Sequence, residues 1–337
     1  MSTDVDLGLT SPQRERESVQ RLLRLLATAG AALMLIVVVT SAYLRLTQAG
    51  LSCSDWPACY GRVGAHAAAT AGIGGARLTH RIAASAVGIV VLAALLIGVA
   101  QRPWQKRQVA ITIAALGVAL FLAGLGSTLP ASTDAMPSLR VTLSNLGGGF
   151  ALLALLWWLR LSTLPEPQPR PESFVLLKTA AALALLAAIA QIALGALVSA
   201  KFAALACPAF PSCGADWPQD VLLEGLDPTR GPSFGANGEM LSPPALAALQ
   251  WTHRVGALIV ATLGVVIVPS LLQAGGSARR AGAIVAVLLV GQLVLGAMAV
   301  LASFPLAVVV AHNACAALLL LALMSANRAL YAGAPNQ

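Results

Sequence analysis

Three of the four histidines lie in apolar stretches, where an ionisable side chain is costly and tends to mark function. His80 and His253 each occur in the triplet Thr-His-Arg, and His312 lies in the last apolar stretch. Two imidazoles that face each other inside a helical bundle form a natural axial ligand pair for heme iron. The pattern therefore predicts a heme on His253 and His312. The alternative is that each histidine only hydrogen-bonds between helices.

The first half of the chain offers a different set of ligands. The residue equivalent to His312 is Asn145, whose amide is a poor iron ligand. A heme here would be held by His80, with Asn145 at its other, open face, and open coordination is what oxygen chemistry requires. The glycines at 147–149 either let a flat macrocycle approach or serve close helix packing. His66 lies in an Ala/Gly-rich loop with no neighbour that suggests ligation.

Basic residues accompany these histidines. Arg81 and Arg254 directly follow His80 and His253. Near the membrane interface, a guanidinium can pair bidentately with a heme propionate. We therefore expect both arginines to bind the cofactor. Arg45 and Lys201 lie at matching ends of the first and fifth apolar stretches.

The elements that position these residues are membrane helices. The chain has 337 residues, of which 58% are hydrophobic and 10% charged, outside the range of soluble domains. The apolar runs are continuous, which argues against a membrane barrel. The predicted fold is an all-α membrane protein with eight transmembrane helices, at about 24–44, 79–100, 108–128, 139–159, 175–199, 247–273, 281–303 and 306–327.

The distribution of Lys and Arg predicts that both termini are cytoplasmic, in a bacterial inner membrane. This asymmetry explains the net charge of +8, so the charge does not indicate nucleic acid binding. The predicted organisation is a cytoplasmic segment 1–23, an N-terminal four-helix half 24–160, a linker 161–174, a C-terminal four-helix half 175–328 and a cytoplasmic tail 329–337.

The halves repeat each other. THRIAASAVGIVV at 79–91 recurs as THRVGALIVATLGVVIV at 252–268, and SNLGGGFALLAL at 144–155 aligns with AHNACAALLLLAL at 311–323. QIALGALVSA at 191–200 and QLVLGAMAVLA at 292–302 also resemble each other. An even number of helices per half predicts two parallel four-helix-bundle repeats, with one pocket each.

The cysteines follow the same repetition. Cys53 with Cys59, and Cys207 with Cys213, are each six apart and fall on the predicted outer side, where disulfides persist. We expect each pair to form a disulfide that stiffens a loop over one pocket. Free or metal-binding thiols are the alternative. Cys315 is expected to be a small core residue.

These motifs resemble the heme A synthase family along nearly the whole chain. The resemblance rests on RLTQAGLSCSDWPACYG at 45–61, ACPAFPSC at 206–213, the His-Arg pairs and His312. It implies an enzyme that oxidises a ring methyl of heme O to the formyl group of heme A. It also implies a heme b bound by His253 and His312, and a substrate heme bound by the catalytic residue His80. Membrane lipid and an unidentified electron donor are further expected partners. Association with the heme O-producing enzyme and with further copies of the chain are both left open.

Two positions depart from that family. A glutamate is expected three residues before the first histidine, but Arg77 stands there, and Asn145 replaces a second histidine. These changes favour an alternative function, a non-catalytic heme-binding or oxidase-assembly protein. A transporter is a third possibility, but the polar residues lie at the outer ends of the helices instead of forming a midplane site.

Overall fold

The computed structural model describes residues 11–48, 72–101, 103–127, 138–165, 175–213, 217–231 and 243–330. The first cysteine pair, Cys53 and Cys59, and the loop histidine His66 lie outside these residues. The predictions for them are therefore not tested.

The described chain is helical. Its elements are α1 (Ser11–Gln48), α2 (Gly72–Ala100), α3 (Lys106–Ser127), α4 (Leu139–Ser162), α5 (Val175–Ala200), the 3₁₀ helix η2 (Ala203–Ala206), α6 (Gln219–Leu226), α7 (Pro244–Gln273), α8 (Gly276–Leu301) and α9 (Leu306–Leu330).

The predicted all-α membrane fold is confirmed. Eight of the described helices, all except η2 and α6, are long and apolar enough to cross a membrane. Apolar side chains on their outer faces are strongly exposed, for example Leu176 at 84% and Val287 at 72%. Exposure of this kind suits contact with lipid acyl chains, because the bilayer core is itself apolar. The protein is a multi-pass membrane protein.

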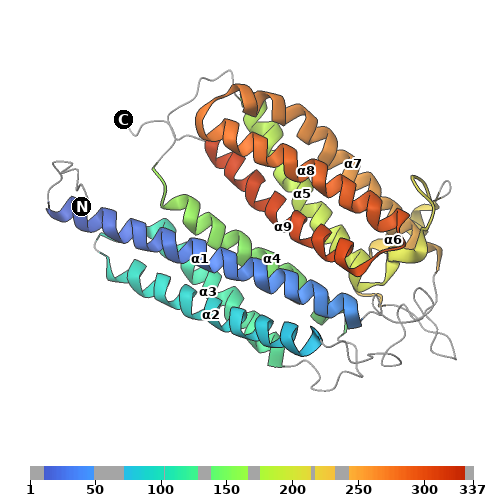
Figure 1. Cartoon of the computed structure of the whole chain (residues 1–337), viewed down its shortest axis with the longest axis horizontal. Helices are drawn as coiled ribbons and strands as arrows, with labels where there is room; N and C mark the ends of the chain where they lie inside the picture. The colour runs from blue at the N-terminus through green and yellow to red at the C-terminus, as the bar shows by residue number, and fades with distance from the viewer. Residues whose placement is uncertain are drawn as a thin grey trace.

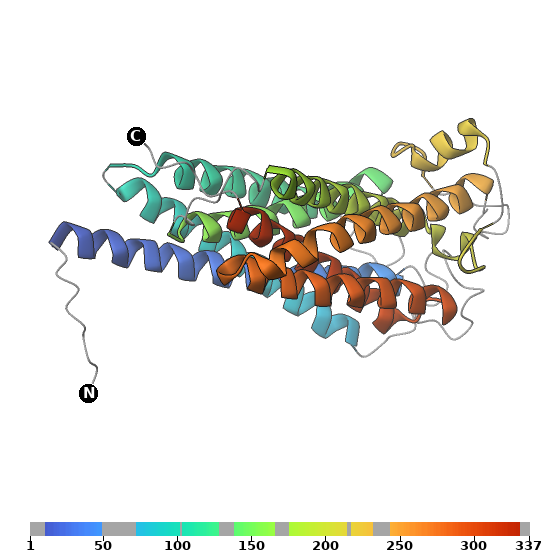
Figure 2. The same ribbon diagram turned by 90° about the horizontal axis from the view of Figure 1, so that it is seen from above.

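The helices pack in the same neighbour relations in both halves (Figures 1 and 2). In the first half, α1 and α3 each contact both α2 and α4. In the second half, α5 and α8 each contact both α7 and α9. Helices α7 and α9 therefore lie diagonally across a four-helix ring. That the halves are two parallel repeats, with the boundaries given above, stays a prediction.

The two halves meet mainly where α1 and α4 contact α9. One core crosses this seam, because Ala317 and Leu321 of α9 belong to the same buried cluster as Met34 of α1 and Leu153 of α4. A second cluster, which includes Ile267 and Val285, fills the C-terminal half. Each half therefore has an apolar core of its own, and the core of the N-terminal half extends across the seam to α9.

A short helix that was not among the eight predicted lies between the disulfide loop and α7. Residues 219–226 form this helix, α6. This helix lies against the start of α7, with Gly225 packed on the Ala245 carbonyl. Lys201, only 2% exposed, donates from Nζ to the carbonyls of Gly225 at 2.9 Å and Glu224 at 3.4 Å. The lysine thus caps the last turn of α6.

Replacing Lys201 with methionine is expected to loosen α6. The two carbonyls lose their donor, and an unsatisfied buried polar group costs about 1–3 kcal/mol. Faster hydrogen exchange in residues 219–226 would report the change, and the same exchange rate as in the wild type would contradict it.

The same lysine predicts a pH dependence. Burial lowers the pKa of Lys201 from its ordinary value of 10.5. As the pH rises from the folded pKa toward 10.5, the unfolded chain binds more protons than the folded chain, so stability increases over that window. The expected rise in melting temperature at alkaline pH is smaller in Lys201→Met than in the wild type.

Candidate functional site

His253 lies in the third turn of α7 and points at α5. Gln191 of α5 donates from Nε2 to the His253 carbonyl at 2.8 Å, and the same atom lies 3.1 Å from Nδ1 of the His253 ring. One turn further along α5, a Cβ on Gly195 would lie 3.1 Å from Cε1 of that ring. The imidazole therefore sits over a residue without a side chain, with Nδ1 beside the Gln191 amide. Ligation through Nε2 requires the ring proton on Nδ1, so the Gln191 amide must then present its oxygen to that atom.

His312 is held in a similar way by α8. Its Nε2 lies 3.1 Å from Nε2 of Gln292, and a Cβ on Gly296 would lie 3.2 Å from its Cε1. Its Nδ1 is buried without a hydrogen-bond partner among the described residues. Coordination of iron through Nε2 of His312 therefore requires the Gln292 amide to leave that atom.

Both histidines thus rest on the same pair of residue types, Gln and Gly, spaced four apart on the neighbouring helix. We call Gln191 with Gly195, and Gln292 with Gly296, the two cradles. Residues four apart share a helix face, so each cradle faces one ring. The two repeated stretches QIALG and QLVLG carried this signal in the sequence, but they were not assigned to the site.

The fold brings the two rings together across the C-terminal ring of helices. His253 and His312 come from the diagonal helices α7 and α9 and are close enough to interact electrostatically. Buried polar atoms without a partner gather around them, namely Oε1 of Gln191, Oε1 of Gln292 and Nδ1 of His312. Such atoms are rare in folded proteins and call for an explanation, such as a ligand that binds between them.

These features fit a heme. Two imidazoles on diagonal helices are the residue type that binds heme iron axially, and each glycine lets its ring pack against the neighbouring helix. The described residues contain no group of three or more His, Cys, Asp and Glu that could hold a metal ion. Ligation by His253 and His312 nevertheless stays a prediction.

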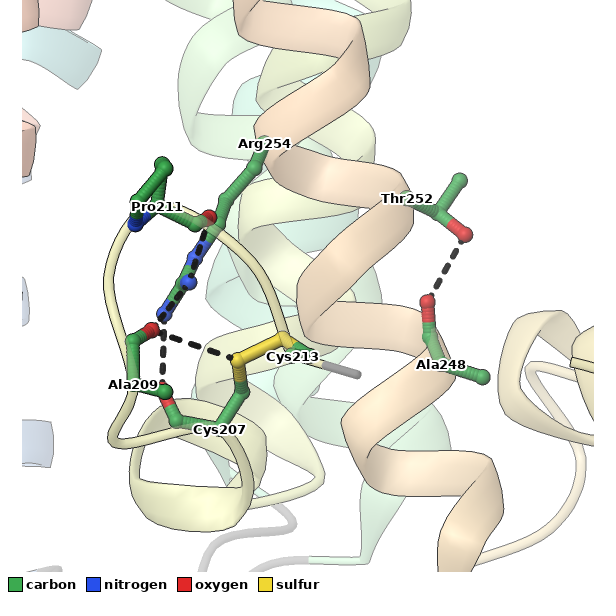
Figure 3. Close-up of a disulfide and its surroundings, with 7 residues drawn as sticks. All are labelled: Cys207, Ala209, Pro211, Cys213, Ala248, Thr252 and Arg254. Carbon is green, nitrogen blue, oxygen red and sulfur yellow. Dashed lines mark hydrogen bonds between the residues drawn. A yellow bond between two sulfur atoms is a disulfide. The ribbon is translucent and has the colours of Figure 1, made fainter. Parts of the chain in front are cut away.

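Arg254 does not extend toward these rings. Its guanidinium donates to the carbonyls of Cys207 at 2.7 Å, Ala209 at 2.6 Å and Pro211 at 3.0 Å (Figure 3). Cys207 and Cys213 form the predicted disulfide, with Cα atoms 5.2 Å apart. Arg254 thus ties the disulfide loop to α7, one residue from His253. Nε, which is buried without a described partner, and the second hydrogen of Nη2 are left for the predicted propionate contact.

Replacing Arg254 with glutamine is expected to release this loop. Three carbonyls lose a charged donor, and hydrogen bonds to charged groups are worth about 1.5–3 kcal/mol each. Hydrogen exchange of residues 203–213 should speed up at least tenfold, while exchange in α8 stays unchanged. Equal hydrogen-exchange rates of this loop in the wild type and in Arg254→Gln would contradict the role of Arg254 in holding the loop.

The N-terminal half presents His80 differently. Thr40 of α1 donates its hydroxyl to the Ile36 carbonyl at 2.7 Å, and its Oγ1 lies 3.3 Å from Nδ1 of His80. Because the hydroxyl proton is already used, Oγ1 acts as acceptor toward an Nδ1–H, which leaves Nε2 unprotonated. This tautomer is the one that can bind iron. Sequence reasoning missed Thr40, because threonine is common in helices.

The other predicted residues of the first half are not joined to His80 by any described hydrogen bond. Arg81 is exposed, and Arg77 and Asn145 are half-buried. Gly148 packs under Leu122, whose Cδ2 would lie 2.7 Å from a Cβ there, so this glycine serves helix packing. Gly147 and Gly149 face open space and remain compatible with either role.

The chain is similar to known proteins along most of its length. Residues 24–324 match the model of the COX15-CtaA family, described as cytochrome oxidase assembly protein. The chain is also 32% identical over 316 residues to a heme A synthase of Shewanella oneidensis, in an alignment that covers 88% of this chain and 93% of that protein.

Proposed function

Because the chain belongs to the COX15-CtaA family of cytochrome oxidase assembly proteins, with a role in heme A biosynthesis, we propose that it is the oxidoreductase that converts heme O to heme A. The observation that carries the proposal is the pair of histidines on diagonal helices, each over its own cradle. The similar heme A synthase of Shewanella oneidensis supports the same substrate and product here.

In the C-terminal half, His253 and His312 would hold a heme b. When bound, this heme supplies an iron that can pass single electrons. Gln191 orients the His253 ring through Nδ1, and its amide contains both a donor and an acceptor, so it can serve either tautomer. Arg254 and the disulfide loop cover the outer end of α7 and limit the access of water to this site.

In the N-terminal half, His80 would bind the substrate heme, with its tautomer set by Thr40. Converting a methyl to a formyl group removes four electrons and adds one oxygen atom to the substrate. No acidic residue lies three residues before His80, where Arg77 stands. If the reaction requires a carboxylate at this place, Arg77 cannot supply it.

Arg77 and Asn145 therefore favour one second candidate, an assembly protein that binds heme without oxidising it. Expression in membranes that contain heme O separates the two candidates. We expect chromatography and mass measurement of the extracted hemes to find heme A or its hydroxylated precursor. Heme b with unchanged heme O, in a folded and heme-loaded protein, would support the assembly function.

We also propose the orientation predicted by the basic residues, with both termini cytoplasmic in the bacterial inner membrane. The disulfide between Cys207 and Cys213 supports it, because disulfides persist on the oxidising side. A reporter enzyme that is active only outside the cytoplasm should be inactive when fused at residue 337. An active fusion at this position would show that the orientation is the reverse of the proposed one.

A further inference from the structure

Arginines from three helices meet at the C-terminal end of α4, far from the histidines. Arg24 of α1 donates to Oγ1 of Thr163 at 3.3 Å and to the Thr163 carbonyl at 2.6 Å. Arg328 of α9 donates to the carbonyls of Leu164 at 2.9 Å and Pro165 at 2.7 Å. Arg160 of α4 itself lies over the ring of Trp157, 4.5 Å from its centroid. This arginine cluster sits at the seam between the two halves.

No carboxylate of the described residues forms an ion pair with Arg24 or Arg160. The ion pairs of Arg21 with Glu17, and of Arg230 with Glu224 and Asp227, lie outside this cluster. The C-terminal end of a helix supplies only about half a negative charge. Two guanidinium groups close enough to repel each other therefore leave an excess of about one and a half positive charges.

Capping of α4 explains only part of the cluster. Arg24 does contact a carbonyl of the last turn, as a capping cation would. Arg160, in contrast, makes no described hydrogen bond, and its Nε is buried without a partner among the described residues. A buried donor on a charged side chain is costly unless an acceptor binds it. No acceptor among the described residues meets this donor, which leaves it open to an anion that approaches from the membrane.

The location identifies the source of that anion. Arg24 and Arg160 lie at the predicted cytoplasmic ends of their membrane spans, at the level of the lipid headgroups. The neighbouring side chains Leu25, 67% exposed, and Trp158, 43% exposed, face the membrane. Basic pockets between membrane helices on this side typically bind anionic headgroups, and arginine matches the geometry of phosphate. We propose that Arg24 and Arg160 bind the phosphate of an anionic phospholipid at the seam between the halves.

Thermal unfolding of the purified full chain in a neutral detergent tests the site. Phosphatidylglycerol is added to one sample, phosphatidylcholine to a second and inorganic phosphate to a third. A ligand that binds only the folded protein raises its melting temperature. We expect a clear rise with phosphatidylglycerol and little with the other two. An equal rise with inorganic phosphate would mean a free anion site, and an equal rise with phosphatidylcholine would overturn the charge argument.

Variants locate the effect. Arg160→Gln should lose more than half of the phosphatidylglycerol shift, and Arg160→Lys should keep most of it, because the charge remains. Arg280→Gln is the matched control, since Arg280 is an exposed arginine on the same predicted side. Only the lipid-induced shift is compared, so a lower starting stability does not affect the result. Equal shifts in Arg160→Gln and Arg280→Gln would overturn the proposal.

If Arg160→Gln does not fold, mass spectrometry of the intact wild-type protein released from detergent gives an independent test. We expect one anionic phospholipid to stay bound to the wild type under conditions in which Arg24→Gln loses it. Retention of the same lipid by wild type and Arg24→Gln alike would place it elsewhere on the protein.

Discussion

Replacing His253 or His312 with alanine is expected to abolish the low-spin, six-coordinate heme spectrum of the purified protein. Each substitution removes one of two axial ligands, and the rings come from different helices, so neither can replace the other. Losing an outer-shell partner of a metal ligand typically costs about 10–100-fold in affinity, and losing the ligand itself should cost more. Heme content per protein and the visible spectrum of the reduced protein measure the effect.

His80→Ala is the matched control for this experiment. His80 occupies the same place in the repeated Thr-His-Arg motif, but in the other half, beside Thr40. It should leave the six-coordinate spectrum intact while it prevents binding of heme O. A six-coordinate spectrum that persists in both His253→Ala and His312→Ala would show that the heme lies elsewhere. Its loss in His80→Ala alone would place it in the first half.

The long helices could be predicted from the sequence, and the short ones could not. A continuous stretch of about twenty apolar residues can pair its backbone N–H and C=O groups inside a membrane only by forming a helix. Composition alone therefore predicts these helices. The eight residues of α6 lie in a Gly/Pro-rich stretch and have no such signal. Their helix is held by tertiary contacts, namely the Lys201 ammonium at its last turn and the close approach of Gly225 to α7.

The histidines of the site could be predicted as well, because ionisable residues in apolar stretches are conspicuous. Their cradles could not be assigned, because Gln191 and Gly195 acquire a role only when α5 packs against α7. Arg254 was predicted to bind a propionate from its place beside His253. Its contacts with three carbonyls of the disulfide loop depend on where that loop folds back, which a local motif does not specify.

Filling a cradle is the second large effect that we expect. A Cβ at Gly195 would lie 3.1 Å from Cε1 of His253, and one at Gly296 would lie 3.2 Å from Cε1 of His312. Both distances are tighter than ordinary van der Waals contact, so even alanine must displace the ring. Valine adds two methyl groups more than alanine does, and the overpacking should cost about 1–3 kcal/mol. Most of the resulting displacement should fall on the imidazole ring. We therefore expect a moderate loss of heme from Gly195→Ala and Gly296→Ala, and about a 10–100-fold weaker affinity in the valine variants.

Gly291→Ala separates this effect from a general response of α8 to added volume. A Cβ at Gly291 would lie 3.7 Å from Sγ of Cys315, an ordinary contact, and Gly291 lies on the same helix as Gly296. Its heme content and melting temperature should match those of the wild type. The added methyl group in Gly195→Ala or Gly296→Ala displaces the ring without removing it. Both variants should therefore also shift the reduction potential of the heme that remains bound. Normal heme content and an unchanged potential in Gly296→Val would contradict iron binding by His312. A heme loss in Gly291→Ala equal to that in Gly296→Ala would assign the effect to helix packing.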